Sequence, residues 1–156
     1  TAVLIGAALK MGVLAVGADE NVCQSFYEFG LNLGILFQLQ DDYLDVFGEE
    51  NIFGKVSGGD IKENKRTLFF IHSIENGSKE DVESLLSLYS FQSKDFDKKK
   101  REVINIFKKN KSDVYLRHII ENYNQKILNS IDNLPIKVKK QKQFFGLFKT
   151  ILNRKL

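Results

Sequence analysis

The chain has 156 residues, the size of one domain, and 43% of them are apolar, which is enough to form a buried core. Its formal net charge is +3, far from the concentrated positive charge of a nucleic-acid-binding protein, so no nucleic-acid partner is expected. The single cysteine, Cys23, excludes an internal disulfide and fits the reducing environment of the cytoplasm.

The first segment, residues 1–16, is rich in small and apolar residues that permit close helix packing, and Gly17 is suited to end it. The segment is too short to span a bilayer, and it has no basic leader, so it predicts neither an anchor nor a signal peptide. No methionine opens the chain, and the first residue already belongs to an apolar periodic segment. We therefore expect a single all-α domain fragment, residues 1–156, of a longer protein.

A long helix is predicted for residues 20–47, with Asp19 as its N-terminal cap. Its middle, residues 31–40, is apolar on most sides, which is typical of a helix inside a bundle. Glycine-rich residues 48–59 then predict a loop.

The rest of the chain also follows helical periodicity. We expect helices over residues 60–76, 78–88, 96–109 and 112–134, with Ser78 as a cap and Pro135 in the first turn of a last helix. The run Lys98–Arg101 is interpreted as a solvated face. No segment alternates as a strand does, so the sequence predicts an all-α helical bundle.

Three carboxylates lie close together on the long predicted helix. Asp41 and Asp45 share a face at a spacing of four residues, and Asp42 lies about 100° round from Asp41. Gln38 borders the same patch. Like charges at this spacing destabilise a helix, and burial without partners would cost far more, so positive charge must compensate them.

Two kinds of compensation are open at this point. Magnesium prefers oxygen ligands and typically takes one or two carboxylates together with substrate phosphates. Basic side chains could pair with the aspartates instead, and the candidates are Lys55, Lys62, Lys65 and Arg66. The apolar helix around the aspartates favours a functional cluster, because a merely solvated face needs no such setting.

The pattern of residues 37–65 resembles the second aspartate-rich region of trans-isoprenyl diphosphate synthases. The matching elements are, in order, Phe37-Gln38-Leu39-Gln40-Asp41-Asp42-Tyr43-Leu44-Asp45, Gly54-Lys55, Gly59-Asp60-Ile61 and Lys65. A lone DDxxD would be weak evidence, but this combination over about thirty residues is highly specific. The resemblance covers residues 1–68 and implies the C-terminal part of the all-helical isoprenoid synthase fold.

The resemblance also implies roles for individual residues. Asp41 would bind Mg²⁺ that bridges to an allylic diphosphate, with Asp42 and Asp45 as supporting members of the metal cluster. Lys55 and Lys65 would bind the diphosphate. Gln38 would lie along the developing allylic cation, and the hydroxyl of Thr1 would lie near the reacting carbons.

The family's reaction condenses isopentenyl diphosphate with an allylic diphosphate, giving a geranyl, farnesyl, geranylgeranyl or longer product. These enzymes are usually homodimers, and residues 1–16 resemble part of the dimer surface. The family also has an earlier DDxxD motif that this sequence lacks. We therefore expect a C-terminal half whose parent protein is a prenyltransferase, and which is inactive by itself.

Two other functions are considered. A class I terpene synthase has a metal motif with the spacing of Asp41, Asp42, Asp45 and Glu49, but Asp45 stands where that motif requires Ser or Thr. A non-catalytic partner subunit of a prenyl synthase would explain the missing motif without truncation.

The C-terminal segment raises a separate question about membranes. Its lysines and the apolar run 144–152 could form an interfacial helix, but a helix that covers the bundle is the favoured interpretation.

Overall fold

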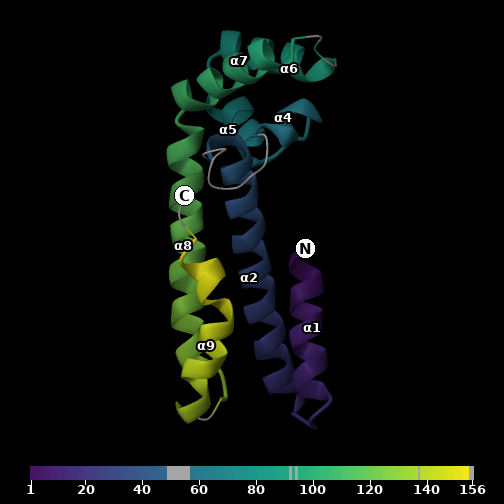
Figure 1. Cartoon of the computed structure of the whole chain (residues 1–156), viewed down its shortest axis with the longest axis vertical. Coiled ribbons are helices and arrows are strands. Elements are labelled where there is room, and N and C mark those ends of the chain that lie inside the picture. The colour runs from purple at the N-terminus through teal and green to yellow at the C-terminus, as the bar shows by residue number, and fades with distance from the viewer. Residues whose placement is uncertain (49–56, 92, 94, 137, 155–156) are drawn as a thin grey trace. The chain divides into compact units, whose positions relative to one another are not determined.

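The computed structural model describes residues 1–48, 57–91, 93, 95–136 and 138–154. Within these residues the regular secondary structure is entirely helical, which confirms the predicted all-α fold. The helices, labelled as in Figure 1, are α1 (Ala2–Leu14), α2 (Glu20–Phe47), α4 (Gly59–Lys62), α5 (Leu68–Asn76), α6 (Lys79–Ser90), α7 (Phe96–Lys109), α8 (Ser112–Asn133) and α9 (Val138–Leu152).

The chain divides into two compact units. One contains Thr1–Gln40 and the C-terminal stretch that begins at Ile119, and the other contains Asp41–His118. Helices α2 and α8 therefore contribute residues to both units.

In the first unit, α1 and α2 lie side by side (Figure 1). A Cβ atom placed on Gly30 would lie 2.7 Å from the Cα of Gly6, and one placed on Gly34 would lie 2.5 Å from the Cα of Ala2. Only glycine leaves room for two backbones at such a distance. The small residues of the first segment thus have the packing role expected from the sequence.

The ends of α1 and α2 follow the sequence signals. Gly17 has φ 79°, and the N–H of Ala18 donates to the carbonyl of Val13 at 3.2 Å, a bond typical of a helix that ends on a left-handed residue. The carboxylate of Asp19 accepts the N–H of Val22 at 3.0 Å, so Asp19 caps α2 as predicted.

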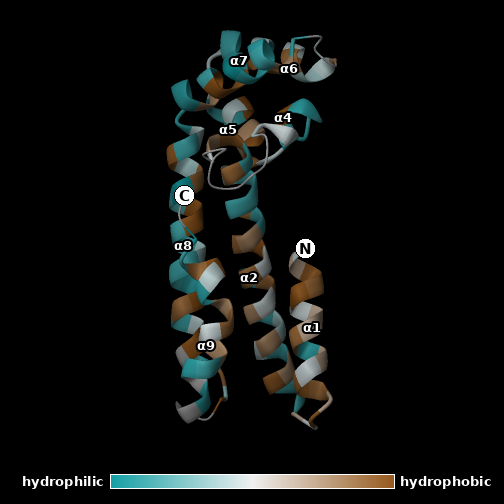
Figure 2. Ribbon diagram, in the orientation of Figure 1, coloured by the Kyte–Doolittle hydropathy of each residue, from teal (hydrophilic) through white to brown (hydrophobic). Residues whose placement is uncertain are grey.

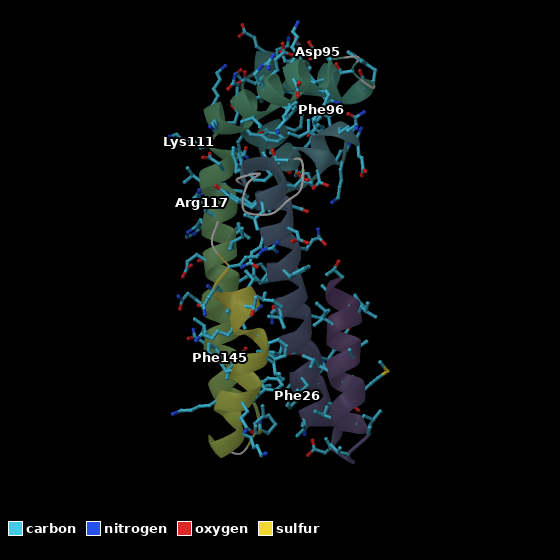
Figure 3. All side chains as sticks on the ribbon, in the orientation of Figure 1. Phe26, Asp95, Phe96, Lys111, Arg117 and Phe145 are labelled. Atoms are coloured by element: carbon cyan, nitrogen blue, oxygen red, sulfur yellow. The ribbon has the colours of Figure 1, made fainter. Side chains whose placement is uncertain are left out.

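Helix α9 packs on α2 through aromatic rings. The Phe144 ring lies 5.6 Å from that of Phe26 and 5.5 Å from that of Phe29, and Phe148 lies 5.5 Å from Phe29 (Phe26 is labelled in Figure 3). The helix thus covers the apolar face of α2, as the favoured interpretation of the C-terminal segment expected. No described helix is both long and apolar enough to cross a membrane.

The second unit is organised around a separate aromatic core. Phe69 of α5 stacks on Phe107 of α7 with ring centroids 5.4 Å apart, and both side chains are fully buried. Ser78 caps α6 by accepting the N–H of Asp81 at 3.2 Å, as predicted. Asp95 caps α7 by accepting the N–H of Lys98 at 2.9 Å, and α7 starts at the next residue, Phe96 (Figure 3).

The single helix predicted for residues 60–76 is wrong. Two helices, α4 and α5, occupy this stretch, because Asn64 takes the left-handed conformation with φ 57° and interrupts the helical path. The turn folds Lys65 back onto Asp60 rather than carrying it forward along a helix axis.

Two smaller predictions also need correction. Pro135 precedes α9 rather than lying in its first turn, since α9 begins at Val138. The run Lys98–Arg101 is not a uniformly solvated face, because Lys99 is only 3% exposed. Lys99 lies four residues before the buried Val103, on the side of α7 that faces the core.

Candidate functional site

The carboxylate of Asp45 joins the end of α2 to the start of α4. Its two oxygens accept the backbone N–H groups of Gly59 at 3.1 Å and Asp60 at 2.9 Å. Burial raises the pKa of the Asp45 carboxyl above its ordinary value, while the hydrogen bond from the backbone of Asp60 acts in the opposite direction. Asp45 therefore positions α4, and its role in metal binding stays a prediction.

Gly58 and Gly59 allow this junction. Gly58 has φ 93°, and its N–H donates to the backbone carbonyl of Asp45 at 2.6 Å. A Cβ atom on Gly59 would lie 3.1 Å from the carboxylate of Asp45, so a larger residue would press on the bound oxygen. The two glycines let the backbone wrap closely around one carboxylate.

The ammonium of Lys65 lies between carboxylates from two helices. It is 3.0 Å from an oxygen of Asp60 on α4 and 3.6 Å from an oxygen of Asp42 on α2. The Asp42 and Asp60 side chains are 12% and 16% exposed, and Lys65 is 49% exposed. Burial lowers the pKa of Lys65, but hydrogen bonding and charge from Asp60 and Asp42 outweigh it, and the net shift is upward.

Asp60 is a site residue that the sequence analysis did not assign. It belongs to the Gly59-Asp60-Ile61 element of the motif, Lys65 follows it by five residues, and the motif gives it no role of its own. The backbone turn at Asn64 creates this pair, with the N–H of Lys65 donating to the carbonyl of Asp60 at 2.9 Å.

The acidic side chains of this site suit a metal ion that takes most of its ligands from water or substrate rather than from protein side chains. Among the described residues, no group of three or more His, Cys, Asp or Glu side chains converges on one point. Magnesium, however, commonly takes one or two protein carboxylates together with waters and phosphate oxygens. Asp41 and Asp42 are the neighbouring carboxylates predicted for this role, which stays a prediction. The structure pairs Asp42 with the Lys65 ammonium at 3.6 Å, so a basic side chain compensates part of the negative charge.

Two other predicted site residues meet in the first unit. The Thr1 hydroxyl donates to the side-chain carbonyl oxygen of Gln38 at 3.0 Å. The resemblance predicts a separate role for each residue, with Thr1 near the reacting carbons and Gln38 along the allylic cation. The predicted diphosphate ligand Lys55 lies outside the described residues.

The polyprenyl synthetase family model matches residues 1–107. The chain belongs to this family. The match confirms the resemblance found in the motif of residues 37–65 and extends it into α7.

Relatives of this polyprenyl synthetase chain are named as synthases of isoprenyl diphosphates. A geranylgeranyl diphosphate synthase from Methanosarcina mazei is 44% identical over 82 residues, which are 53% of this chain and 25% of that protein. One from Sulfolobus acidocaldarius is 33% identical over 138 residues, which are 88% of this chain and 41% of that protein.

Solved structures show the same likeness. A crystal structure of geranylgeranyl pyrophosphate synthase matches 100% of this chain and 49% of its own, with 37% sequence identity and a TM-score of 0.86. The chain thus spans less than half of the length of each of these three proteins.

Proposed function

We propose that this chain carries the second aspartate-rich site of a trans-prenyltransferase, and that the whole enzyme condenses isopentenyl diphosphate with an allylic diphosphate. In this proposal Asp41 and Asp42 hold Mg²⁺, while Lys65 and Lys55 bind the allylic diphosphate. The observation that carries the proposal is the Lys65 ammonium, held between Asp42 and Asp60. It supplies a fixed positive charge beside carboxylates that suit a divalent ion.

The arrangement fits the departure of a diphosphate group. Mg²⁺, when bound, neutralises negative charge that accumulates on the leaving group. Lys65 adds a second positive charge, and its position is fixed by its hydrogen bond to Asp60. Charges that are already in place stabilise a transition state without having to reorganise.

Thr1 and Gln38 contribute on the hydrocarbon side in this proposal. The hydrogen bond from Thr1 orients the amide of Gln38, whose carbonyl oxygen carries partial negative charge. An oriented amide dipole can stabilise an allylic cation. The same hydroxyl would lie near the reacting carbons.

Calorimetric titration of the 156-residue chain with inorganic pyrophosphate, with and without Mg²⁺, tests the site. We expect binding that requires Mg²⁺. Loss of one charge-assisted contact costs on the order of 1.5–3 kcal/mol, so Asp42→Asn should weaken binding by about ten- to hundredfold. Asp97→Asn, which changes an exposed aspartate on α7, is the matched control. Pyrophosphate binding that does not depend on Mg²⁺ would refute the proposed site. Unchanged affinity in the Asp42→Asn variant would refute it as well.

The chain alone is proposed to be inactive in condensation, because its sequence holds one DDxxD, at Asp41–Asp45. An assay of the 156-residue chain with Mg²⁺ and both substrates should show no product. Turnover in that assay would contradict the proposal that a second acidic motif is required.

We also propose that the enzyme is a cytoplasmic homodimer and that α1 lies in its interface. Four large apolar side chains of α1 are more than half exposed, namely Val3, Leu4, Met11 and Leu14. Figure 2 shows the apolar character of this helix along much of its length. Exposed apolar faces of this kind commonly mark protein interfaces.

A further inference from the structure

The turn after α4 determines where Lys65 lies. Asn64 has φ 57°, its N–H donates to Ile61 at 3.2 Å, and the N–H of Lys65 donates to Asp60 at 2.9 Å. This pair of bonds around a left-handed residue forms a Schellman motif, in which glycine is the usual central residue and asparagine a less common one. The side chain of Lys65 is therefore returned to α4 and reaches Asp60.

Unlike a glycine, Asn64 also offers a side chain that other elements can hold. Its Oδ1 accepts a hydrogen bond from the ammonium of Lys99 on α7. Its Nδ2 donates to the backbone carbonyl of Phe91 at 3.4 Å. The turn is thus fixed from α7 and from the end of α6.

Lys99 occupies an unusual environment for a lysine. It is 3% exposed, its ammonium lies 5.3 Å from the Tyr89 ring centroid, and no carboxylate in the described part of the chain forms an ion pair with it. Burial lowers the pKa of Lys99 below its ordinary value. Among the described residues this ammonium has the Asn64 side chain as its hydrogen-bond partner and no counterion. A buried charge without a counterion destabilises a fold, so packing alone does not account for Lys99.

The next residue of α7 holds the other end of the same segment. The ammonium of Lys100 donates to the hydroxyl of Ser57 at 2.6 Å. A Cβ atom on Gly58 would lie 3.1 Å from the Cδ of Lys100, so the lysine stem lies close against the backbone there. Two consecutive lysines therefore hold both ends of residues 57–64, the segment that presents Asp60.

We propose that Lys99 is a positioning residue for the anion site: through Asn64 it fixes the turn that holds Lys65 between Asp42 and Asp60, and Lys100 steadies the start of the same segment. This inference rests on the proposed function, because it gives Lys99 a purpose only if Lys65 binds a diphosphate. It makes a specific prediction, namely that Lys99 lowers the stability of the fold while improving ligand binding.

The test compares Lys99→Met with Lys98→Met in the 156-residue chain. Methionine keeps most of the length and the apolar contact of the lysine stem but removes the ammonium. Lys98 is the matched control, since its side chain is 66% exposed on the same helix. Each variant is examined for its melting temperature and for its affinity for inorganic pyrophosphate with Mg²⁺.

For Lys99→Met we expect an unchanged or higher melting temperature. We expect its affinity for pyrophosphate with Mg²⁺ to fall about tenfold, the lower end of the loss seen when a residue that supports a metal ligand is replaced. Lys98→Met should change neither quantity. A merely structural role for Lys99 predicts a lower melting temperature with unchanged affinity, and that result would overturn the proposal. Equal affinity in Lys99→Met and the unmodified chain overturns it as well.

A double-mutant cycle tests whether Lys99 acts through Asn64. Asn64→Gly keeps the left-handed turn but removes the acceptor, and we expect the same loss of affinity as in Lys99→Met. The double variant should lose no more than either single variant, and Lys99→Arg should restore part of the affinity. Additive losses would refute the route through Asn64. If the unmodified chain itself fails to bind pyrophosphate with Mg²⁺, the proposed function fails, and the positioning role fails with it.

Discussion

The hydroxyl of Thr1 donates a hydrogen bond to the side-chain oxygen of Gln38 at 3.0 Å, although the two residues are 37 positions apart in the sequence. The contact is possible because α1 and α2 pack backbone against backbone at Gly30 and Gly34. The small residues of these helices therefore do more than fill space. They fix the register that brings two predicted site residues together.

Replacing Gly34 with alanine should separate the two helices. The new Cβ would lie 2.5 Å from the Cα of Ala2, a backbone atom that can move only if α1 shifts. Overpacking of this kind costs about 1–3 kcal/mol, more than the gain of about 1 kcal/mol that alanine brings to a helix. Urea unfolding should therefore show a lower free energy of unfolding for Gly34→Ala.

Gly12→Ala is the control for that experiment. It makes the same change inside α1, but a Cβ atom there would meet nothing within 4 Å. We expect Gly12→Ala to be stabilised by up to about 1 kcal/mol. If the two variants were equally stable, the close approach of α1 and α2 would not exist in solution.

Removing the Lys65 ammonium should have opposite effects on two ligands. Lys65→Met leaves Asp42 and Asp60 without the cation between them, so Mg²⁺ alone should bind more tightly, by about three- to tenfold. Pyrophosphate with Mg²⁺ should bind about tenfold or more weakly, because a charge-assisted contact is lost. Calorimetry with each ligand measures both changes.

Lys62→Met serves as the control for Lys65→Met. Lys62 lies on the neighbouring α4 with its ammonium 6.0 Å from the Phe96 ring centroid, away from the pair of aspartates that Lys65 joins. The Lys62→Met variant should bind Mg²⁺ and pyrophosphate with affinities close to those of the unmodified chain. If Lys65→Met bound both Mg²⁺ alone and pyrophosphate with Mg²⁺ more weakly, the result would contradict an electrostatic role and indicate local unfolding.

The long helices could be predicted from the sequence because their signals are local. Asp19 and Gly17 mark ends through their own backbone and side-chain chemistry, and apolar periodicity defines the buried face of α2 and α7. The spacing of Asp41 and Asp42 likewise follows from the helix alone. These features need no knowledge of distant residues.

The break at Asn64 could not be predicted in this way. No glycine or proline interrupts residues 60–76, and the turn is held by Lys99, 35 residues further along the chain. Lys99 did carry a signal, because it precedes the buried Val103 and Phe107 by four and eight residues. Because all four residues of the run Lys98–Arg101 are charged, the sequence predicts a solvated face there in spite of that spacing.

The pair of Asp81 and Lys109 predicts how stability depends on pH. The Lys109 ammonium lies 2.8 Å from the Asp81 carboxylate, and this hydrogen bond lowers the Asp81 pKa below its ordinary value. The folded state therefore binds this proton less readily than the unfolded state, so stability from the pair is full above the ordinary aspartate pKa of about 4. That stability is lost as the pH falls below this value, toward the lower pKa of the folded chain.

Lys109→Met should remove this contribution. At pH 7 its urea midpoint should lie below that of the unmodified chain, and the two midpoints should converge as the pH falls through the lowered pKa of Asp81, because Asp81 then becomes protonated in both. Lys79→Met is the control, since Lys79 and Glu83 form a pair at 3.9 Å with side chains 90% and 68% exposed. Such exposed pairs contribute little. A pH-independent difference for Lys109→Met would show that Asp81 is not the group concerned.

The exposed face of α1 predicts how the chain assembles. Leu4 and Met11 are 73% and 60% exposed and lie seven residues apart, on one side of the helix. If this face forms the interface with a second copy, the Leu4→Glu, Met11→Glu double variant should place unpaired charges there and dissociate the dimer. Its circular dichroism should not change, because neither side chain is needed in the core. Analytical ultracentrifugation of the 156-residue chain measures the outcome.

Leu86→Glu provides the matched control for the interface. Leu86 is 47% exposed on α6, so the variant makes one substitution of the same kind at an exposed apolar position of a different helix. It should sediment as the unmodified chain does, whereas the α1 variant should sediment as a monomer at every concentration. Equal sedimentation of all three proteins would place the interface elsewhere, and a monomeric unmodified chain would refute association through α1 altogether. Dissociation that leaves Mg²⁺-dependent pyrophosphate binding intact would show that the acidic site in Asp41–His118 does not depend on the second copy.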